Sequence, residues 1–136
     1  MKLLKLILLS FLLISCDSHN KDKTYDDYLE FHCLWHEIFL KDDASYFVYF
    51  YSQTCPHCER IKNEIFAYID QKTKPLYLVV KSGAMVFTKD ISKTIGVDKI
   101  EAFSIYAFPS LVHIHDGLVL FNEYGANNIS NIISSM

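Results

Sequence analysis

The sequence predicts one domain of the α/β class, in which helices cover both faces of a mixed β-sheet. A strand–helix–strand unit over residues 46–80 implies two parallel strands joined by a right-handed crossover. Two later strands meet at Asp116-Gly117, a strong signal for a hairpin, which adds antiparallel strands. The 136 residues leave room for one domain, and a hydrophobic content of 51% is enough for one packed core.

Each element follows from a local pattern. Apolar side chains recur at helical spacing in residues 25–40, and an unbroken aromatic and β-branched run at 46–51 is typical of a strand buried on both faces. The later elements are predicted as a helix over 56–71, a strand over 76–80, an irregular segment over 83–108 with helical turns near 91–95 and 100–105, strands over 111–115 and 118–124, and a short helix from Asn127.

The N-terminus is predicted to lie outside this domain. Lys2 and Lys5 precede an apolar run that is too short to span a bilayer and therefore indicates a secretory signal, residues 1–15. The run ends in Leu-Ile-Ser-Cys, which resembles the lipobox of bacterial lipoproteins. That resemblance implies a lipid on Cys16, a polar tether over residues 16–24 and a domain over residues 25–136. An ordinary signal peptide followed by a coincidental cysteine is the alternative.

The composition limits the kinds of binding partner to be expected. The net charge is −3, and no run of lysine or arginine suggests nucleic-acid binding. Export would permit disulfides to persist. Of the four cysteines, Cys55 and Cys58 form a C-x-x-C pair, whereas Cys33 has no obvious partner.

The C-x-x-C pair lies where a buried strand ends and a helix begins. Cys55 at the helix N-terminus would be stabilised as a thiolate by free N–H groups and the helix dipole, and Pro56 suits the first helical position. Cys58 begins the apolar stripe of the helix, so Cys55 is expected to be accessible and Cys58 covered. A redox pair is favoured; a structural disulfide or half of a zinc site remain alternatives.

These residues resemble the thioredoxin superfamily. Phe108-Pro109-Ser110-Leu111-Val112 resembles the cis-proline strand of that family, and His115-Asp116-Gly117 the hairpin after it. The resemblance implies a thioredoxin-like three-layer sandwich with a mixed central sheet. It also implies a cis bond before Pro109, with Phe108 and Pro109 binding the substrate peptide.

The dipeptide Pro56-His57 is similar to that of the DsbA family of periplasmic disulfide oxidases, and His57 would stabilise the Cys55 thiolate further. One departure concerns proton transfer. Many thioredoxin-like enzymes carry a buried carboxylate six residues before the first cysteine, where this chain has Tyr49. A tyrosine is a poor proton acceptor near neutral pH.

Other candidates are assigned structural or surface roles. Cys33 is expected to be exposed, either as an incidental thiol or as one that forms a mixed disulfide. His32 and His36 could share a metal with Cys33 but fit ordinary boundary residues better. His113 and His115 share one face of a strand and are interpreted as structural. No metal and no cofactor other than the Cys55–Cys58 disulfide is expected.

The resulting hypothesis is a lipid-anchored thiol-disulfide oxidoreductase on the extracytoplasmic face of the cell membrane. It would exchange disulfides with exported proteins, in the oxidising direction, and a membrane redox partner would reset the pair. The alternatives are a membrane-tethered thiol reductase, or an export accessory or chaperone with little turnover.

Overall fold

The computed structural model describes residues 22–71 and 73–136. The predicted signal peptide, residues 1–15, and Cys16 lie outside the described residues. Within the described part of the chain, no helix combines the length and apolarity needed to cross a bilayer. The elements, in chain order, are the 3-10 helices η1 (Tyr25–Phe31) and η2 (Trp35–Glu37), β1 (Ser45–Tyr51), α1 (Pro56–Gln71), β2 (Leu76–Val80), η3 (Ile91–Thr94), η4 (Ile100–Ala102), β3 (Ser110–His115), β4 (Leu118–Tyr124) and α2 (Ala126–Ser134).

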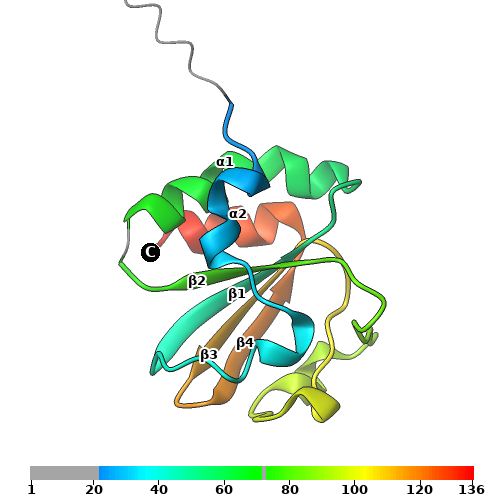
Figure 1. The fold of residues 1–136 in the computed structure, drawn as a ribbon. Coiled ribbons are helices and arrows are strands. Elements are labelled where there is room, and N and C mark those ends of the chain that lie inside the picture. Colours follow the sequence, from blue (N-terminus) through cyan, green and yellow to red (C-terminus); the bar gives the residue numbers. More distant parts are fainter. Residues whose placement is uncertain (1–21, 72) are drawn as a thin grey trace, which may run out of the picture.

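The four strands form one mixed sheet in the order β2-β1-β3-β4 (Figure 1). β1 pairs in parallel with β2 and antiparallel with β3, and β3 pairs antiparallel with β4. The predicted sheet is therefore confirmed. β2, β4 and α1 have the bounds expected from the sequence, and β1 and β3 each begin one residue earlier.

The sheet is the middle of three layers. On one face, residues of α1, α2 and η1 pack with Phe47, Tyr49 and Tyr51. On the other face, η2 and the segment between β2 and β3 pack with Tyr46, Val48 and Phe50. All six of these β1 side chains are buried, because β1 is an inner strand with a layer on each side.

The prediction of one helix over residues 25–40 is wrong. Two short 3-10 helices form instead, and the chain between them runs along the edge of β2. His32 bridges Leu78 in parallel, and the Cys33 N–H donates to the Leu78 carbonyl oxygen at 2.9 Å. The exposed backbone groups of an edge strand attract such a partner. Leu34, expected on the apolar stripe, is consequently exposed.

The other edge of the sheet is covered in a similar way. The Gly96 N–H donates to the Val119 carbonyl oxygen at 2.8 Å, and the Val119 N–H donates to the Val97 carbonyl oxygen at 3.0 Å. These residues follow η3, one of the two helical turns expected in the irregular segment. Both edge strands are thus partly paired with other segments of the same chain.

Candidate functional site

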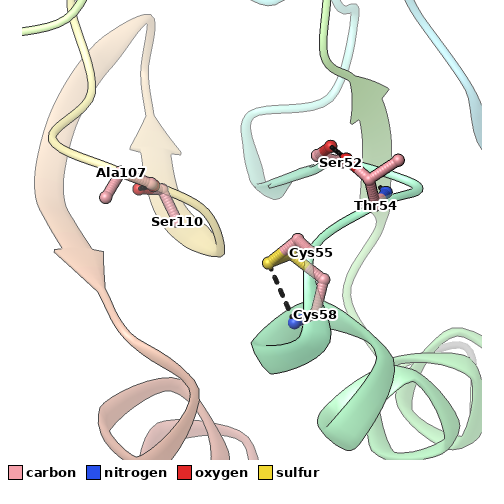
Figure 2. The surroundings of a disulfide bond; sticks show 6 residues. All are labelled: Ser52, Thr54, Cys55, Cys58, Ala107 and Ser110. Atoms are coloured by element: carbon pink, nitrogen blue, oxygen red, sulfur yellow. Dashed lines mark hydrogen bonds between the residues drawn. A yellow bond between two sulfur atoms is a disulfide. The ribbon is translucent and has the colours of Figure 1, made fainter.

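Cys55 and Cys58 form a disulfide between the end of β1 and the start of α1, and their Cα atoms are 5.3 Å apart (Figure 2). Cys55 is half-buried, whereas Cys58 is 1% exposed. The expected asymmetry in burial is therefore confirmed. It follows from helical geometry, because Cys58 shares a face with Ile61 and Ile65, which are buried in the core.

The backbone around the disulfide is arranged to favour negative charge on Cys55. The Cys58 N–H donates to Sγ of Cys55 at 3.1 Å, and the Cys55 N–H donates to the Ser52 carbonyl oxygen at 3.2 Å. Ser52 is buried, and its hydroxyl accepts a hydrogen bond from the Thr54 N–H at 3.4 Å, which shapes the turn before Cys55. An N–H group directed at sulfur at a helix N-terminus stabilises a thiolate over a thiol.

The residues between and after the cysteines lie at the surface. Pro56 occupies the first position of α1, where the N–H it lacks would have no helical partner, and His57 is exposed beside it. Glu59 could oppose a thiolate by repulsion. Its carboxylate instead lies 2.6 Å from the Lys62 ammonium, which offsets its charge. The local balance therefore favours the thiolate.

The Phe108–Pro109 bond is cis, as expected. The Ser110 hydroxyl donates to the Ala107 carbonyl oxygen at 2.6 Å, and the Gly125 N–H donates to the Pro109 carbonyl oxygen at 2.9 Å, so that this turn is held at both ends. Figure 2 shows the turn across from the disulfide, and Phe108 packs against the same core cluster as Cys55. Phe108, one of the predicted substrate-binding residues, and Cys55 thus border one hydrophobic cluster.

The disulfide lies between the end of the inner strand β1 and the start of α1, and a cis-proline turn lies across from it. This arrangement identifies the fold. The fold is thioredoxin-like. On this fold a half-exposed Cys55 and a covered Cys58 support a thiol-disulfide oxidoreductase, since a thiolate can reach Cys55 while Cys58 leaves. The described residues contain no group of three or more His, Cys, Asp or Glu side chains placed to hold a metal ion.

Comparison with known proteins found similar solved structures, but no family model and no curated protein matches the sequence. Thioredoxin f2 of Chlamydomonas reinhardtii is similar in structure, with a TM-score of 0.49, 15% identity and coverage of 76% of this chain and 93% of that one. Plasmodium falciparum thioredoxin has a TM-score of 0.49 and 17% identity, and covers 74% and 89% of the two chains. Drosophila melanogaster Deadhead has a TM-score of 0.47 and 17% identity, and covers 83% and 94%.

Tyr49 lies on the α1 side of β1 in the same core cluster as Cys58 and is fully buried. Its hydroxyl is buried and interacts with the hydroxyl of Tyr25, but neither makes a hydrogen bond of good geometry within the described residues. Burial raises the pKa of Tyr49 well above its usual range. The thioredoxin-like core thus holds a neutral phenol where many relatives of this fold are expected to hold a carboxylate.

Sequence reasoning missed the surroundings of Tyr51, the last residue of β1. The Tyr25 ring stacks on the Tyr51 ring with centroids 3.7 Å apart, and Nε2 of His32 lies 2.6 Å from the Tyr51 hydroxyl. These contacts join the N-terminal segment to the strand that leads into the C-x-x-C motif. No local sequence pattern announces them, because they depend on how η1 lies across the sheet.

The expectation that Cys33 is exposed is wrong. Cys33 is a free cysteine that is only 8% exposed, because the segment that carries it lies along β2 rather than on a surface helix. Burial raises the pKa of its thiol to about 11, which makes it a poor nucleophile at neutral pH. A mixed disulfide through Cys33 is therefore disfavoured.

His113 and His115 lie away from the disulfide, towards the other end of the sheet. Nε2 of His113 lies 2.8 Å from the Ser45 hydroxyl and 3.3 Å from the Lys74 ammonium. His115 lies beside Asp116, with Nε2 and Oδ2 3.3 Å apart, an acidic neighbour that the sequence interpretation overlooked. Both histidines make local contacts within and beside the β3–β4 hairpin.

Proposed function

We propose that this protein oxidises the thiols of exported proteins through the Cys55–Cys58 disulfide. The observation that carries the proposal is the Cys58 N–H directed at Sγ of Cys55, together with an exposed His57 next to it. Both stabilise the thiolate that forms on reduction more strongly than the uncharged sulfur of the disulfide. A fold that stabilises its reduced form has a more oxidising disulfide.

The reaction proceeds in two exchanges. A substrate thiolate attacks Sγ of Cys55, the bond between Cys55 and Cys58 breaks, and Cys58 leaves as a thiolate and takes up a proton. A second substrate thiolate then attacks the substrate sulfur of the mixed disulfide, and Cys55 leaves as a thiolate. The substrate loses two electrons and gains a disulfide, while the protein becomes a dithiol. A membrane redox partner that accepts two electrons restores the disulfide.

Cys55 is the sulfur attacked because it is the accessible one of the pair. Cys58 is 1% exposed, so a polypeptide thiolate cannot approach its sulfur without opening the core. Phe108 and Pro109 supply the wall against which the substrate segment lies, as the resemblance of this turn to the cis-proline strand implies. His57 keeps positive charge near Cys55 when it is protonated.

Attachment to the outer face of the cell membrane through a lipid on Cys16 is part of the proposal. Its support is the sequence, in which a short apolar run ends at a lipobox-like cysteine. Two acyl chains on one residue give stable anchoring. Residues 22–24 of the expected tether are described, and the Lys23 ammonium lies 2.6 Å from the Asp70 carboxylate. This contact would hold the end of the proposed tether beside α1.

The test is the redox potential of the pair in glutathione buffers. We expect a value above that of thioredoxin, which is about −270 mV. His57→Ala should lower the potential, by roughly 30 mV for each unit by which the Cys55 pKa rises. His36→Ala, a change at another exposed histidine, is the matched control and should leave the potential unchanged. If the wild-type redox potential is as low as that of thioredoxin, the oxidase proposal fails and the reductase takes its place.

A second candidate function is an export accessory or chaperone that rarely uses its cysteines. The observation that favours it is Tyr49, whose buried phenol does not act as a proton acceptor for Cys58 at neutral pH. Assays of insulin reduction and of reduced-substrate oxidation separate it from both enzymes. Only the accessory function predicts that neither reaction proceeds above the rate of a Cys55→Ser variant.

A further inference from the structure

An aromatic pair extends outward from the cis-proline turn. The rings of Phe87 and Phe108 meet edge to face, with centroids 5.7 Å apart and an angle of 83° between their planes. Phe87 is 50% exposed, while Phe108 is half-buried and packs against the same core cluster as Cys55. The exposed ring of Phe87 therefore continues the wall that Phe108 forms at the redox pair.

The backbone fixes the position of Phe87. Phe87 forms a parallel bridge with Ile105; the Thr88 N–H donates to the Ile105 carbonyl oxygen at 2.9 Å, and the Ile105 N–H donates to the Val86 carbonyl oxygen at 3.0 Å. Ile105 is fully buried. Because the backbone of this half-exposed ring is already fixed, the ring loses little further conformational entropy on binding. This favours its contact with an apolar side chain of a partner.

The first charged residue on either side of Phe87 in the sequence is a lysine. No acidic residue occurs between Asp70 and Asp90, or between Glu101 and Asp116, and these stretches include Phe87 and Phe108. Lys81 and Lys89, both exposed, flank Phe87 in the sequence. The Lys81 N–H donates to the Tyr51 carbonyl oxygen at 2.8 Å, so that Lys81 starts at the end of β1, just before the C-x-x-C segment.

Two acids near the redox pair and Phe87 in the sequence already have partners. Glu59 pairs with Lys62, and Asp90 accepts a hydrogen bond from the Ser92 hydroxyl and lies 3.6 Å from the Lys93 ammonium. The whole chain carries a net charge of −3, so the lysines that flank Phe87 in the sequence differ in sign from the protein as a whole. Charge complementarity of this kind selects partners and speeds their encounter.

We propose that Phe87, with Lys81 and Lys89, selects the substrate. The preferred partner is an extended polypeptide segment whose cysteine lies beside a large apolar side chain and near carboxylates. The apolar side chain packs on Phe87 and Phe108 while the carboxylates lie near the two lysines. This selection rests on the proposed function, since the exchange at Cys55 is the one described above, with the same bonds formed and broken.

The test uses four reduced decapeptides and the full-length oxidised protein. Each peptide has two cysteines, with Trp or Ser beside the first, and two Glu or two Gln further along. The second-order rate constant for peptide oxidation is measured for all four. We expect Trp to raise the rate constant about fivefold to tenfold over Ser, as for one aromatic contact. We expect Glu to raise it severalfold over Gln at about 20 mM salt, an advantage that vanishes near about 500 mM.

Matched variants assign each preference. Phe87→Ala should reduce the preference for Trp to less than about twofold, whereas Leu120→Ala, at an equally exposed apolar residue of β4, should preserve it. Lys81→Gln should weaken the preference for Glu, whereas Lys41→Gln, before the opposite end of β1, should not. If wild type oxidises none of the peptides, the proposed function fails. If it oxidises all four equally, or if Phe87→Ala keeps the preference for Trp, the selection is overturned while the oxidase stands.

Discussion

The backbone N–H of Cys58 donates a hydrogen bond to Sγ of Cys55 at 3.1 Å, so the residue with the covered sulfur also contacts the accessible sulfur. The same helical turn that buries the Cys58 side chain presents its amide to the neighbouring sulfur. Two properties of the pair, the acidity of one thiol and the protection of the other, therefore share one structural cause.

The first prediction concerns alkylation of the reduced protein. Cys55 should react much faster than Cys58 with iodoacetamide near pH 7.5, because Cys55 is half-exposed and stabilised as a thiolate while Cys58 is 1% exposed. Cys33 should also react slowly, since burial raises the pKa of its thiol to about 11. Mass mapping after a brief pulse gives the order. Equal labelling of Cys55 and Cys58 would contradict the assigned roles.

The second prediction concerns two buried tyrosines on opposite faces of β1. Tyr49→Phe removes a buried hydroxyl that interacts only weakly with the Tyr25 hydroxyl, so the free energy of unfolding should change by less than about 1 kcal/mol. Tyr46→Phe removes the hydroxyl that donates to the Ile38 carbonyl oxygen at 2.6 Å, so the free energy of unfolding should fall by about 1–2 kcal/mol. Urea unfolding measures both. The idea fails if both variants shift stability in the same direction by the same amount.

Much of this site could be predicted from the sequence because it depends on short-range signals. The apolar run before Cys55, Pro56 at a helix start and the stripe beginning at Cys58 each specify a local conformation, and together they specify a strand–cysteine–helix junction. The cis bond at Pro109 required the resemblance, since the sequence alone placed that proline only at the start of a strand.

The N-terminal segment could not be predicted in the same way. Its apolar spacing fits a helix, but the backbone at Cys33 gains a partner on Leu78 that no local pattern encodes. Tertiary pairing overrode helical periodicity, and the burial of Cys33 and the contact between His32 and Tyr51 followed from it. The aromatic pair of Phe87 and Phe108 also depends on a long-range bridge, at Ile105.

The third prediction concerns pH. Burial, with the charges of Lys74 and His115 nearby, lowers the pKa of His113 below its ordinary value. The unfolded chain then binds a proton more readily than the folded protein, so stability is fully present above about pH 6.5 and decreases as the pH falls toward the folded pKa. Unfolding free energies at pH 7.5 and 5 should fall more for wild type than for His113→Gln. An equal fall in the two proteins would exclude His113 as the cause.

The fourth prediction concerns processing. Cys16→Ser should release the protein from membranes or leave its signal peptide uncut, because the lipobox-like sequence requires the cysteine. Cys33→Ser, which removes another cysteine outside the C-x-x-C pair, is the control and should keep the protein in the membrane fraction. Fractionation and intact mass provide the measurement. Native protein with an unmodified Cys16 would refute the anchor.

The paired margins of the sheet bear on how these molecules behave at high concentration. Free edges of aromatic-rich strands readily recruit strands from other chains and start fibrils. Here the Leu78 carbonyl oxygen on β2 and both backbone groups of Val119 on β4 are already bonded to segments of the same chain. Before a strand of another molecule could pair with these edges, the hydrogen bonds to those segments would have to break. A sheet whose inner strand is nearly all aromatic can therefore remain dispersed where many copies crowd together.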